Sequence, residues 1–293
     1  MSSLKSTIRC REITPADLEA VADLLTRGFS GRRRGYWLEG LRRQAAREFP
    51  AGYPRLGYML DHDGTPVGAL LLIYSERKSQ AQPQIWCNLS SWYVAPAFRN
   101  YAPMLTKIAQ RLGHVSYVNI SAARTTWPII EAQGFRAYCK GLFLSVPALS
   151  HTERRARVEI VSGDSAMIDG LPADEAALLL RHARYRCLSI VVRSERGAIP
   201  FVLQPARMRR GLIPLPAMQL VYCRDVADYA ACAGAIGWFL AKRAKIAVLI
   251  DANGPLPGLV GLYTERRGRK YFKGPRRPRL GDLSDTELVV YGP

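Results

Sequence analysis

The sequence predicts a mixed α/β fold, in which antiparallel strands are followed by a β-α-β crossover and the order of elements is then repeated. The chain has 293 residues, a length typical of about two domains. Its first half combines a hairpin signal at Asp63-Gly64 with strands and helices that alternate later in the sequence. From about Ser150 the same order of elements begins again. We therefore expect two tandem modules, each with a mixed sheet.

Local signals define the elements of the first half. Thr14 is a good N-cap, Pro15 suits the first helical position, and apolar residues recur at helical spacing until Gly28. Gly134 ends a later short helix. Strands are predicted at 10–13, 56–60, 67–74, 85–94 and 115–120, helices at about 14–28, 36–49, 102–112 and 125–132, and a last extended stretch at 135–146.

The second half repeats this order. Strands are predicted at 157–161, 188–193, 199–203, 218–223 and 246–251, helices at 173–184 and 226–243, and closing extended pieces at 271–274 and 287–291. The tetrapeptide Tyr-Cys-Lys-Gly at 138–141 is echoed by Tyr-Phe-Lys-Gly at 271–274, which favours a duplication. We place the linker near 149–155, which divides the chain into modules 1–149 and 150–293.

Composition limits the classes of function. The formal charge of +18 is shared between both halves, so an anionic cofactor, an anionic substrate or nucleic acid are all candidate ligands. No nucleic-acid motif accompanies the basic cluster at 266–279, so nucleic-acid binding is the weaker prediction. The six cysteines include no CxxC pair and the four histidines show no metal-ligand spacing, so no metal is expected. Without a membrane-spanning run or an apolar leader, we expect a cytoplasmic protein.

The segment 92–105 is the strongest candidate for a binding site. Here a strand ends after Trp92, Tyr93 and Val94, a loop turns, and a helix begins. Backbone N–H groups at a helix N-terminus bind anions, and Arg99 adds a positive charge where a pyrophosphate would lie.

This segment resembles motif A of the GCN5-related N-acetyltransferases, which reads roughly V-x-P-x-x-R-G-x-G-x-G. Val94, Pro96 and Arg99 match it. Downstream, residues 130–135 are similar to the family's Y-E-K-x-G-F, with Glu131, Gly134 and Phe135 in place. The resemblance covers about residues 8–146 and implies an acyl-CoA N-acyltransferase-like fold for this module. The second, more divergent module resembles the family only in its order of elements, and we expect the same fold for it. The resemblance also implies that acetyl-CoA or another acyl-CoA is the co-substrate.

The sequence departs from the family pattern at positions that matter. Asn100, Ala102 and Met104 replace the three glycines, and Pro103 removes one N–H group from the phosphate-binding turn. Ile130 stands where the family has a tyrosine that acts as general acid. By the resemblance, the cofactor would contact the residues of two adjoining runs: Trp92, Tyr93 and Val94, and then Arg99, Asn100, Tyr101, Ala102, Pro103 and Met104.

No catalytic residue can be assigned from the sequence. Ser90 and Ser91 are candidates for polarising a thioester carbonyl, and Glu76 is a candidate base, but each also has a structural reading. His114 and His182 are expected to be structural, as is Glu131.

Two hypotheses about function stay open. The first is transfer of an acyl group, with acetyl as the first expectation, from CoA to the amine of a small molecule or peptide, with rate acceleration from proximity. The second is a catalytically silent module that binds an anionic ligand or a partner.

Overall fold

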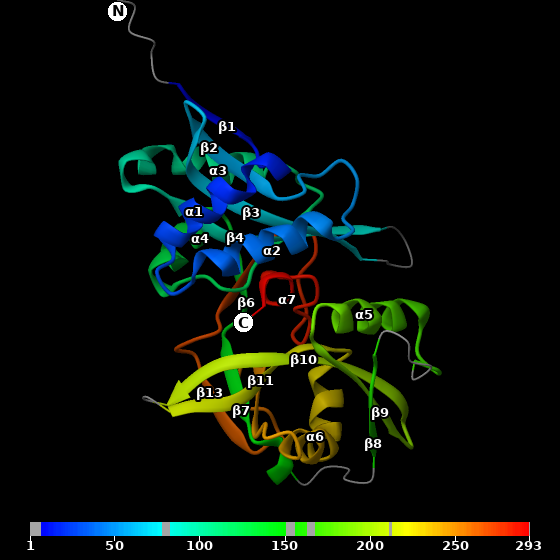
Figure 1. The fold of residues 1–293 in the computed structure, drawn as a ribbon. Helices are drawn as coiled ribbons and strands as arrows, with labels where there is room; N and C mark the ends of the chain where they lie inside the picture. Colours follow the sequence, from blue (N-terminus) through cyan, green and yellow to red (C-terminus); the bar gives the residue numbers. More distant parts are fainter. Residues whose placement is uncertain (1–6, 78–82, 151–155, 163–167, 211–212, 293) are drawn as a thin grey trace, which may run out of the picture.

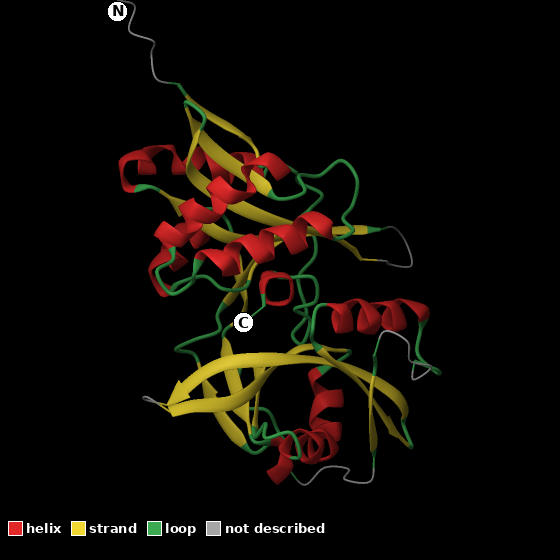
Figure 2. Ribbon diagram, viewed as in Figure 1, coloured by secondary structure: helices red, strands yellow, loops and turns green. Residues whose placement is uncertain are grey.

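The described strands form two sheets of seven strands each. The structure is a computed structural model that describes residues 7–77, 83–150, 156–162, 168–210 and 213–292. Figure 1 shows the two sheets one above the other, with the C-terminal helix between them. Figure 2 shows that helices flank the strands in both halves. This mixed α/β architecture agrees with the predicted fold class. The predicted linker falls partly at 151–155, outside the described residues.

The first sheet carries the predicted N-terminal elements. Its strand order is β1-β2-β3-β4-β5-β14-β6, antiparallel except for the parallel pair β4 and β5. The bounds of the strands from this half are β1 Ile8–Glu12, β2 Gly57–His62, β3 Thr65–Arg77, β4 Gln84–Val94, β5 Ser116–Asn119 and β6 Arg136–Cys139. The helices are η1 Pro15–Asp17, α1 Leu18–Gly28, α2 Arg34–Ala46, η2 Pro96–Tyr101, α3 Ala102–Ala109, η3 Arg124–Thr126 and α4 Trp127–Ala132.

Two apolar layers hold this sheet. Residues of β1 to β5 on one face pack with Leu105 of α3 and Ile130 of α4. Residues on the other face pack with Leu24 of α1 and Leu41 of α2. The alternation of strand side chains between two faces explains why both layers are apolar.

The second sheet has the order β13-β7-β12-β11-β10-β9-β8. Its strands and neighbouring helices are β7 Gly141–Ser145, η4 Pro147–Leu149, β8 Arg157–Ile160, α5 Ala173–Arg184, β9 Leu188–Ser194, β10 Gly197–Arg210, β11 Ile213–Cys223, α6 Val226–Ala241, β12 Ala247–Ala252 and β13 Gly261–Thr264. The helix α6 covers one face through Tyr229, Cys232 and Ile236, and its N-cap Asp225 accepts a hydrogen bond from the Ala227 N–H.

The two halves exchange strands. β7 precedes residue 149 yet pairs with β12 and β13 of the second sheet. β14 (Lys270–Lys273) comes from the second half yet lies between β5 and β6 of the first sheet. The echoed segments at 138–141 and 271–274 are therefore neighbours, since Lys270 pairs with Cys139. The prediction of one extended stretch at 135–146 was wrong, because that stretch breaks after Cys139 and its two parts join different sheets.

The C-terminal piece is a helix, not the predicted extended segment. α7 (Glu287–Tyr291) buries Val289, Val290 and Tyr291. The β-branched Val289 and Val290 are typical of a strand, but the packing of their side chains in the core favours a helix here. Gly40 of α2 makes the packing possible, because a Cβ there would overlap the Tyr291 ring.

Residues 279–291, which we call the clasp, join the two halves. Asp282 pairs with Arg77 from β3, at 2.9 Å, and with Arg279 at 3.4 Å. Asp285 pairs with Arg181 of α5 at 2.9 Å and with Arg47, just after α2, at 3.4 Å. An apolar cluster with residues of both sheets lies beside these pairs and includes Leu283 and Val289. The clasp thus positions the C-terminus against the first sheet.

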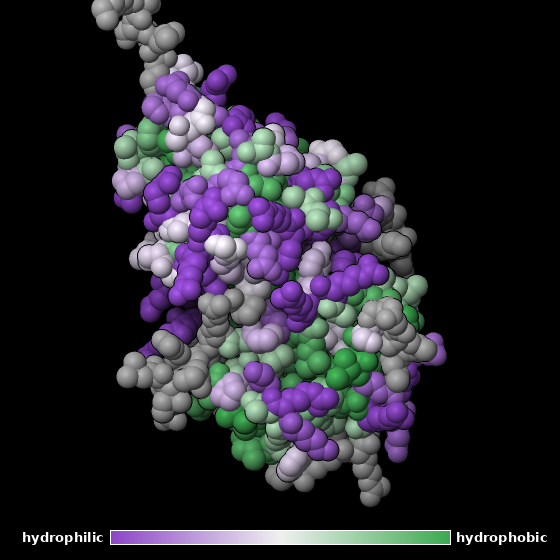
Figure 3. All heavy atoms as spheres, in the orientation of Figure 1, coloured by the Kyte–Doolittle hydropathy of each residue, from purple (hydrophilic) through white to green (hydrophobic). Residues whose placement is uncertain are grey.

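The outer surface is polar over much of the first half. In Figure 3, hydrophilic residues cover most of the visible upper part of the molecule, over α1 and α2. Among the described residues, no helix has both the length and the apolar character needed to cross a membrane.

Candidate functional site

The parallel strands β4 and β5 separate at the centre of the first sheet. They pair from Trp86 to Asn88 on β4, and the pairing ends there although β4 continues to Val94. The register of β4 with β3 shifts nearby, and Ser91 has a positive φ of 53°. This is the geometry of a β-bulge, which bends a strand and redirects its side chains. The bulge leaves a gap between the two strands.

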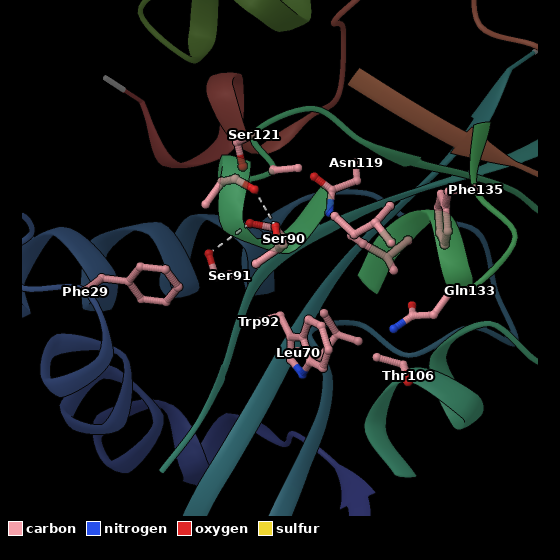
Figure 4. A pocket seen from close by; sticks show the side chains of 15 residues that line it. Phe29, Leu70, Ser90, Ser91, Trp92, Thr106, Asn119, Ser121, Gln133 and Phe135 are labelled. Carbon is pink, nitrogen blue, oxygen red and sulfur yellow. Dashed lines mark hydrogen bonds between the residues drawn. The ribbon is translucent and has the colours of Figure 1, made fainter. Parts of the chain in front are cut away.

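A cavity of about 140 Å³ occupies this gap. Leu89, Ser90, Ser91 and Trp92 of β4 form one wall, and Asn119 and residues 121–123 form another. The remaining lining residues come from α1, β3, α3 and α4 and the segments beside them: Phe29, Leu70, Thr106, Thr126, Ile130, Gln133 and Phe135. Figure 4 shows their side chains gathered around the space between the strands. The cavity is apolar apart from a few hydroxyl and amide groups, as binding sites for small molecules usually are.

Asn88 organises the point at which the strands separate. Its side chain is buried, and its Nδ2 donates to the carbonyl oxygens of Leu89, at 3.2 Å, and Val118, at 3.3 Å. Its Oδ1 accepts a 2.7 Å hydrogen bond from the backbone N–H of Glu287. One amide therefore joins both strands to the start of α7. Nothing in the local sequence signals this role, because the partner lies 199 residues away.

A carboxylate reaches the cavity wall from the far end of the chain. The Ser90 hydroxyl donates a hydrogen bond to Glu287 Oε2, and the Ser90 and Ser91 hydroxyl oxygens lie 2.9 Å apart. Because the one Ser90 proton is directed at Glu287, Ser91 is the donor in the second bond. Figure 4 shows this serine pair at the cavity. The chain Ser91–Ser90–Glu287 is a continuous hydrogen-bonded path.

Burial raises the pKa of Glu287 above its ordinary value, while hydrogen bonds from Ser121 and Ser90 and the charge of Arg32 act in the opposite direction. Sequence reasoning missed this residue, because it treated 287–291 as a closing extended piece and assigned it no role.

The residues expected to bind the cofactor lie in two places. Trp92 lines the cavity, whereas Tyr93 is not among its lining residues and packs against Phe29, with ring centroids 6.3 Å apart. Val94 is buried. The remaining expected residues, Arg99, Asn100, Tyr101, Ala102, Pro103 and Met104, follow β4 on η2 and the start of α3.

The turn after β4 is helical and not an open loop. The Phe98 N–H donates to the Ala95 carbonyl at 2.9 Å, and the Ala102 N–H donates to Arg99. Tyr101 and Met104 are 41% and 39% exposed, and neither lines the cavity. Asn100, Ala102 and Met104, which replace the motif's glycines, are all absent from the cavity lining, so their side chains leave the gap between β4 and β5 open.

The other sequence candidates lie away from the cavity. Glu76 lines a separate hollow near Arg47 and Asp285. His114 shares a 2.8 Å hydrogen bond with the Tyr53 hydroxyl, and His182 is fully buried in α5, where burial lowers its pKa. Glu131 accepts a 2.7 Å hydrogen bond from Tyr271 of β14, which is a structural contact.

Within the described ranges, no group of three or more His, Cys, Asp and Glu side chains is arranged to hold a metal ion.

Comparison with solved structures assigns the fold. A GCN5-related N-acetyltransferase from Anabaena variabilis aligns with a TM-score of 0.55 at 10% identity, over 91% of this chain and 72% of that one. A probable N-acyltransferase from Enterococcus faecalis gives 0.56 at 12%, over 96% and 74%. A putative acetyltransferase from Pyrococcus horikoshii gives 0.51 at 12%, over 100% and 95%.

This chain has the GCN5-related N-acetyltransferase fold. The alignments span both sheets, so the two tandem modules predicted from the sequence fit this fold. No protein-family model and no curated protein matches the sequence. At identities of 10–12%, the likeness concerns the fold alone.

Proposed function

We propose that this protein is an acyl-CoA-dependent N-acyltransferase whose reaction takes place in the cavity between β4 and β5. The single observation that supports this most strongly is the bulge at Ser91, which opens the gap and directs a serine–glutamate path to it. A silent binding module would need the gap but not a buried carboxylate connected to it. We therefore prefer the enzyme hypothesis.

The acyl thioester would lie in the gap between the strands. Beyond Asn88, the edge of β4 that faces β5 has no strand partner among the described residues. Its backbone groups can therefore bond to amides of an extended ligand such as the pantetheine arm. Arg99 and the residues up to Met104 lie on η2 and the start of α3, which follow β4. In this proposal they contact the phosphates of CoA.

The chemical step is direct attack by an amine on the thioester. The nitrogen–carbon bond forms, the carbon–sulfur bond breaks, and CoA leaves as a thiolate that takes a proton from water. The proton lost by the amine passes to Ser91 and then through Ser90 to Glu287. A carboxylate with a raised pKa is a better proton acceptor near neutral pH than an ordinary one.

Release of the CoA thiol from acetyl-CoA in the presence of an amine panel tests the function. We expect amine-dependent release, and a higher KM for acetyl-CoA in Arg99→Gln than in the control Arg111→Gln, a substitution of another exposed arginine. An absence of release with every amine would contradict the proposal and favour the silent binding module.

A further inference from the structure

A second, strongly basic cavity adjoins the one between β4 and β5. It has a volume of about 520 Å³ and is lined by Arg124, Arg266, Arg267 and Arg269 together with Trp127. Ser121, Ala122 and Ala123 line both cavities, so the two share a wall. No carboxylate is among the described residues that line the basic cavity.

Its arginines are poorly neutralised. Among the ion pairs of the described residues, none involves Arg124, Arg266 or Arg267. Arg269 lies 4.0 Å from Glu131, the outer limit of an ion pair, and Glu131 already accepts a hydrogen bond from Tyr271. The buried Nε of Arg269 has no hydrogen-bond partner among the described residues. By contrast, Arg77, Arg181 and Arg279 are each paired with an aspartate of the clasp.

Trp127 holds two of the guanidinium groups in place. The Arg269 guanidinium lies 4.2 Å and that of Arg124 5.6 Å from the Trp127 ring centroid. The indole N–H donates to the Ala122 carbonyl at 3.2 Å. The aromatic ring therefore fixes two cations beside the shared wall. A guanidinium held in this way presents paired N–H groups to a carboxylate or phosphate.

We infer that this cavity binds an anionic group, a carboxylate or a phosphate, on the acceptor substrate. The inference depends on the proposed function, since an acceptor whose anion lies among the arginines would extend past Ser121, Ala122 and Ala123 for its amine to reach Ser91. The acceptor class is thus an amine that also carries a negative charge, such as an amino acid or an aminoalkyl phosphate. For the arginine cluster at 266–269, the sequence alone left four possibilities open: a solvated loop, or binding of an anionic substrate, a cofactor or nucleic acid. The inference assigns it to the acceptor substrate.

Matched acceptors test the charge requirement. We expect 2-aminoethyl phosphate and 6-aminohexanoate to be acetylated with higher kcat/KM than 2-aminoethanol and 6-aminohexanol. The double variant Arg124→Gln/Arg267→Gln should lose this preference by about 10- to 100-fold. The control Arg196→Gln, an exposed arginine of the β9–β10 turn, should keep it. Equal rates for charged and neutral acceptors in the unmodified protein would overturn the inference.

Two further measurements distinguish an acceptor site from a cofactor site. If the double variant weakens binding of acetyl-CoA but not of acetyl-dephospho-CoA, the arginines bind the cofactor's 3′-phosphate and the acceptor assignment is overturned. Calorimetry with 2-aminoethyl phosphate alone needs no turnover. If 2-aminoethyl phosphate binds the unmodified protein but not the double variant, the anion site is supported. If, in addition, no amine causes release of the CoA thiol, the proposed acyl transfer is contradicted.

Discussion

At the scale of single residues, the candidate site depends on Glu287. This carboxylate comes from the last helix, is buried, and contacts Ser90 of β4 through a hydrogen bond. The Asn88 side chain fixes its backbone at 2.7 Å, so its position is set from two directions. The site therefore depends on the folded chain as a whole and not on the motif at 92–104 alone.

Glu287→Gln should remove a pH dependence. An ordinary glutamate has a pKa of about 4.3. Because burial raises the pKa of Glu287 above its ordinary value, this base becomes ionised only at a correspondingly higher pH. We expect kcat/KM to fall as the pH is lowered through that raised pKa. In Glu287→Gln this limb should disappear and the rate should drop about 100-fold or more. Initial rates measured between pH 5 and 9, with Glu195→Gln on the exposed β9–β10 turn as the control, give the comparison. An unchanged profile in Glu287→Gln would show that the proton goes elsewhere.

At the scale of elements, the exchange of β7 and β14 joins the two sheets. Lys270 of β14 is almost fully buried and lies 2.7 Å from Asp251 of β12, whose side chain is 1% exposed. Burial raises the pKa of Asp251, while the Lys270 charge lowers it. This pair links a strand of the first sheet to one of the second.

Lys270→Met should be strongly destabilising. It leaves Asp251 buried without its cation, which costs about 3–5 kcal/mol of the free energy of unfolding. The double variant Lys270→Met/Asp251→Leu should recover much of this loss because no buried charge remains. Urea unfolding gives both values, and the exposed Lys140→Met is the control. A loss below about 1 kcal/mol for Lys270→Met would mean that Asp251 finds another partner or water.

The sequence predicted most elements but not their partners. The hairpin at Asp63-Gly64 and the helix at 173–184 follow from local turn chemistry and periodicity, and both were confirmed. The break after Cys139 was not predictable, because it depends on β14 and β12, more than 100 residues later. The role of Glu287 was not predictable for the same reason, because its partners Asn88 and Ser90 are on β4, far away in the sequence.

At the scale of the whole molecule, the clasp holds the two halves together by buried charges. Burial acts to raise the pKa of Asp285, but Arg181, His182 and Arg47 lower it below its ordinary value overall. A depressed pKa means that the carboxylate stabilises the fold above the unfolded-state pKa of about 3.9, and that this contribution is lost as the pH falls through the folded-state value.

Asp285→Asn should therefore lower the free energy of unfolding at neutral pH and change it little at acidic pH. We expect a loss of about 3 kcal/mol at pH 7, because Arg47 is left buried without its counter-charge. The difference from the unmodified protein should shrink below about pH 4. Denaturant unfolding at several pH values measures it, with the exposed Asp63→Asn as the control. A loss that is the same at pH 7 and pH 3 would contradict the ionic role of Asp285.

Calorimetric titration with acetyl-CoA tests the central claim most directly, namely that the gap between β4 and β5 receives an acyl thioester. We expect saturable binding at micromolar to millimolar concentrations. Ala122 lines the cavity, and the larger side chain in Ala122→Trp would occupy part of it. We therefore expect this variant to bind acetyl-CoA at least about tenfold more weakly. No detectable binding up to millimolar acetyl-CoA, or equal binding by the unmodified protein and Ala122→Trp, would contradict it.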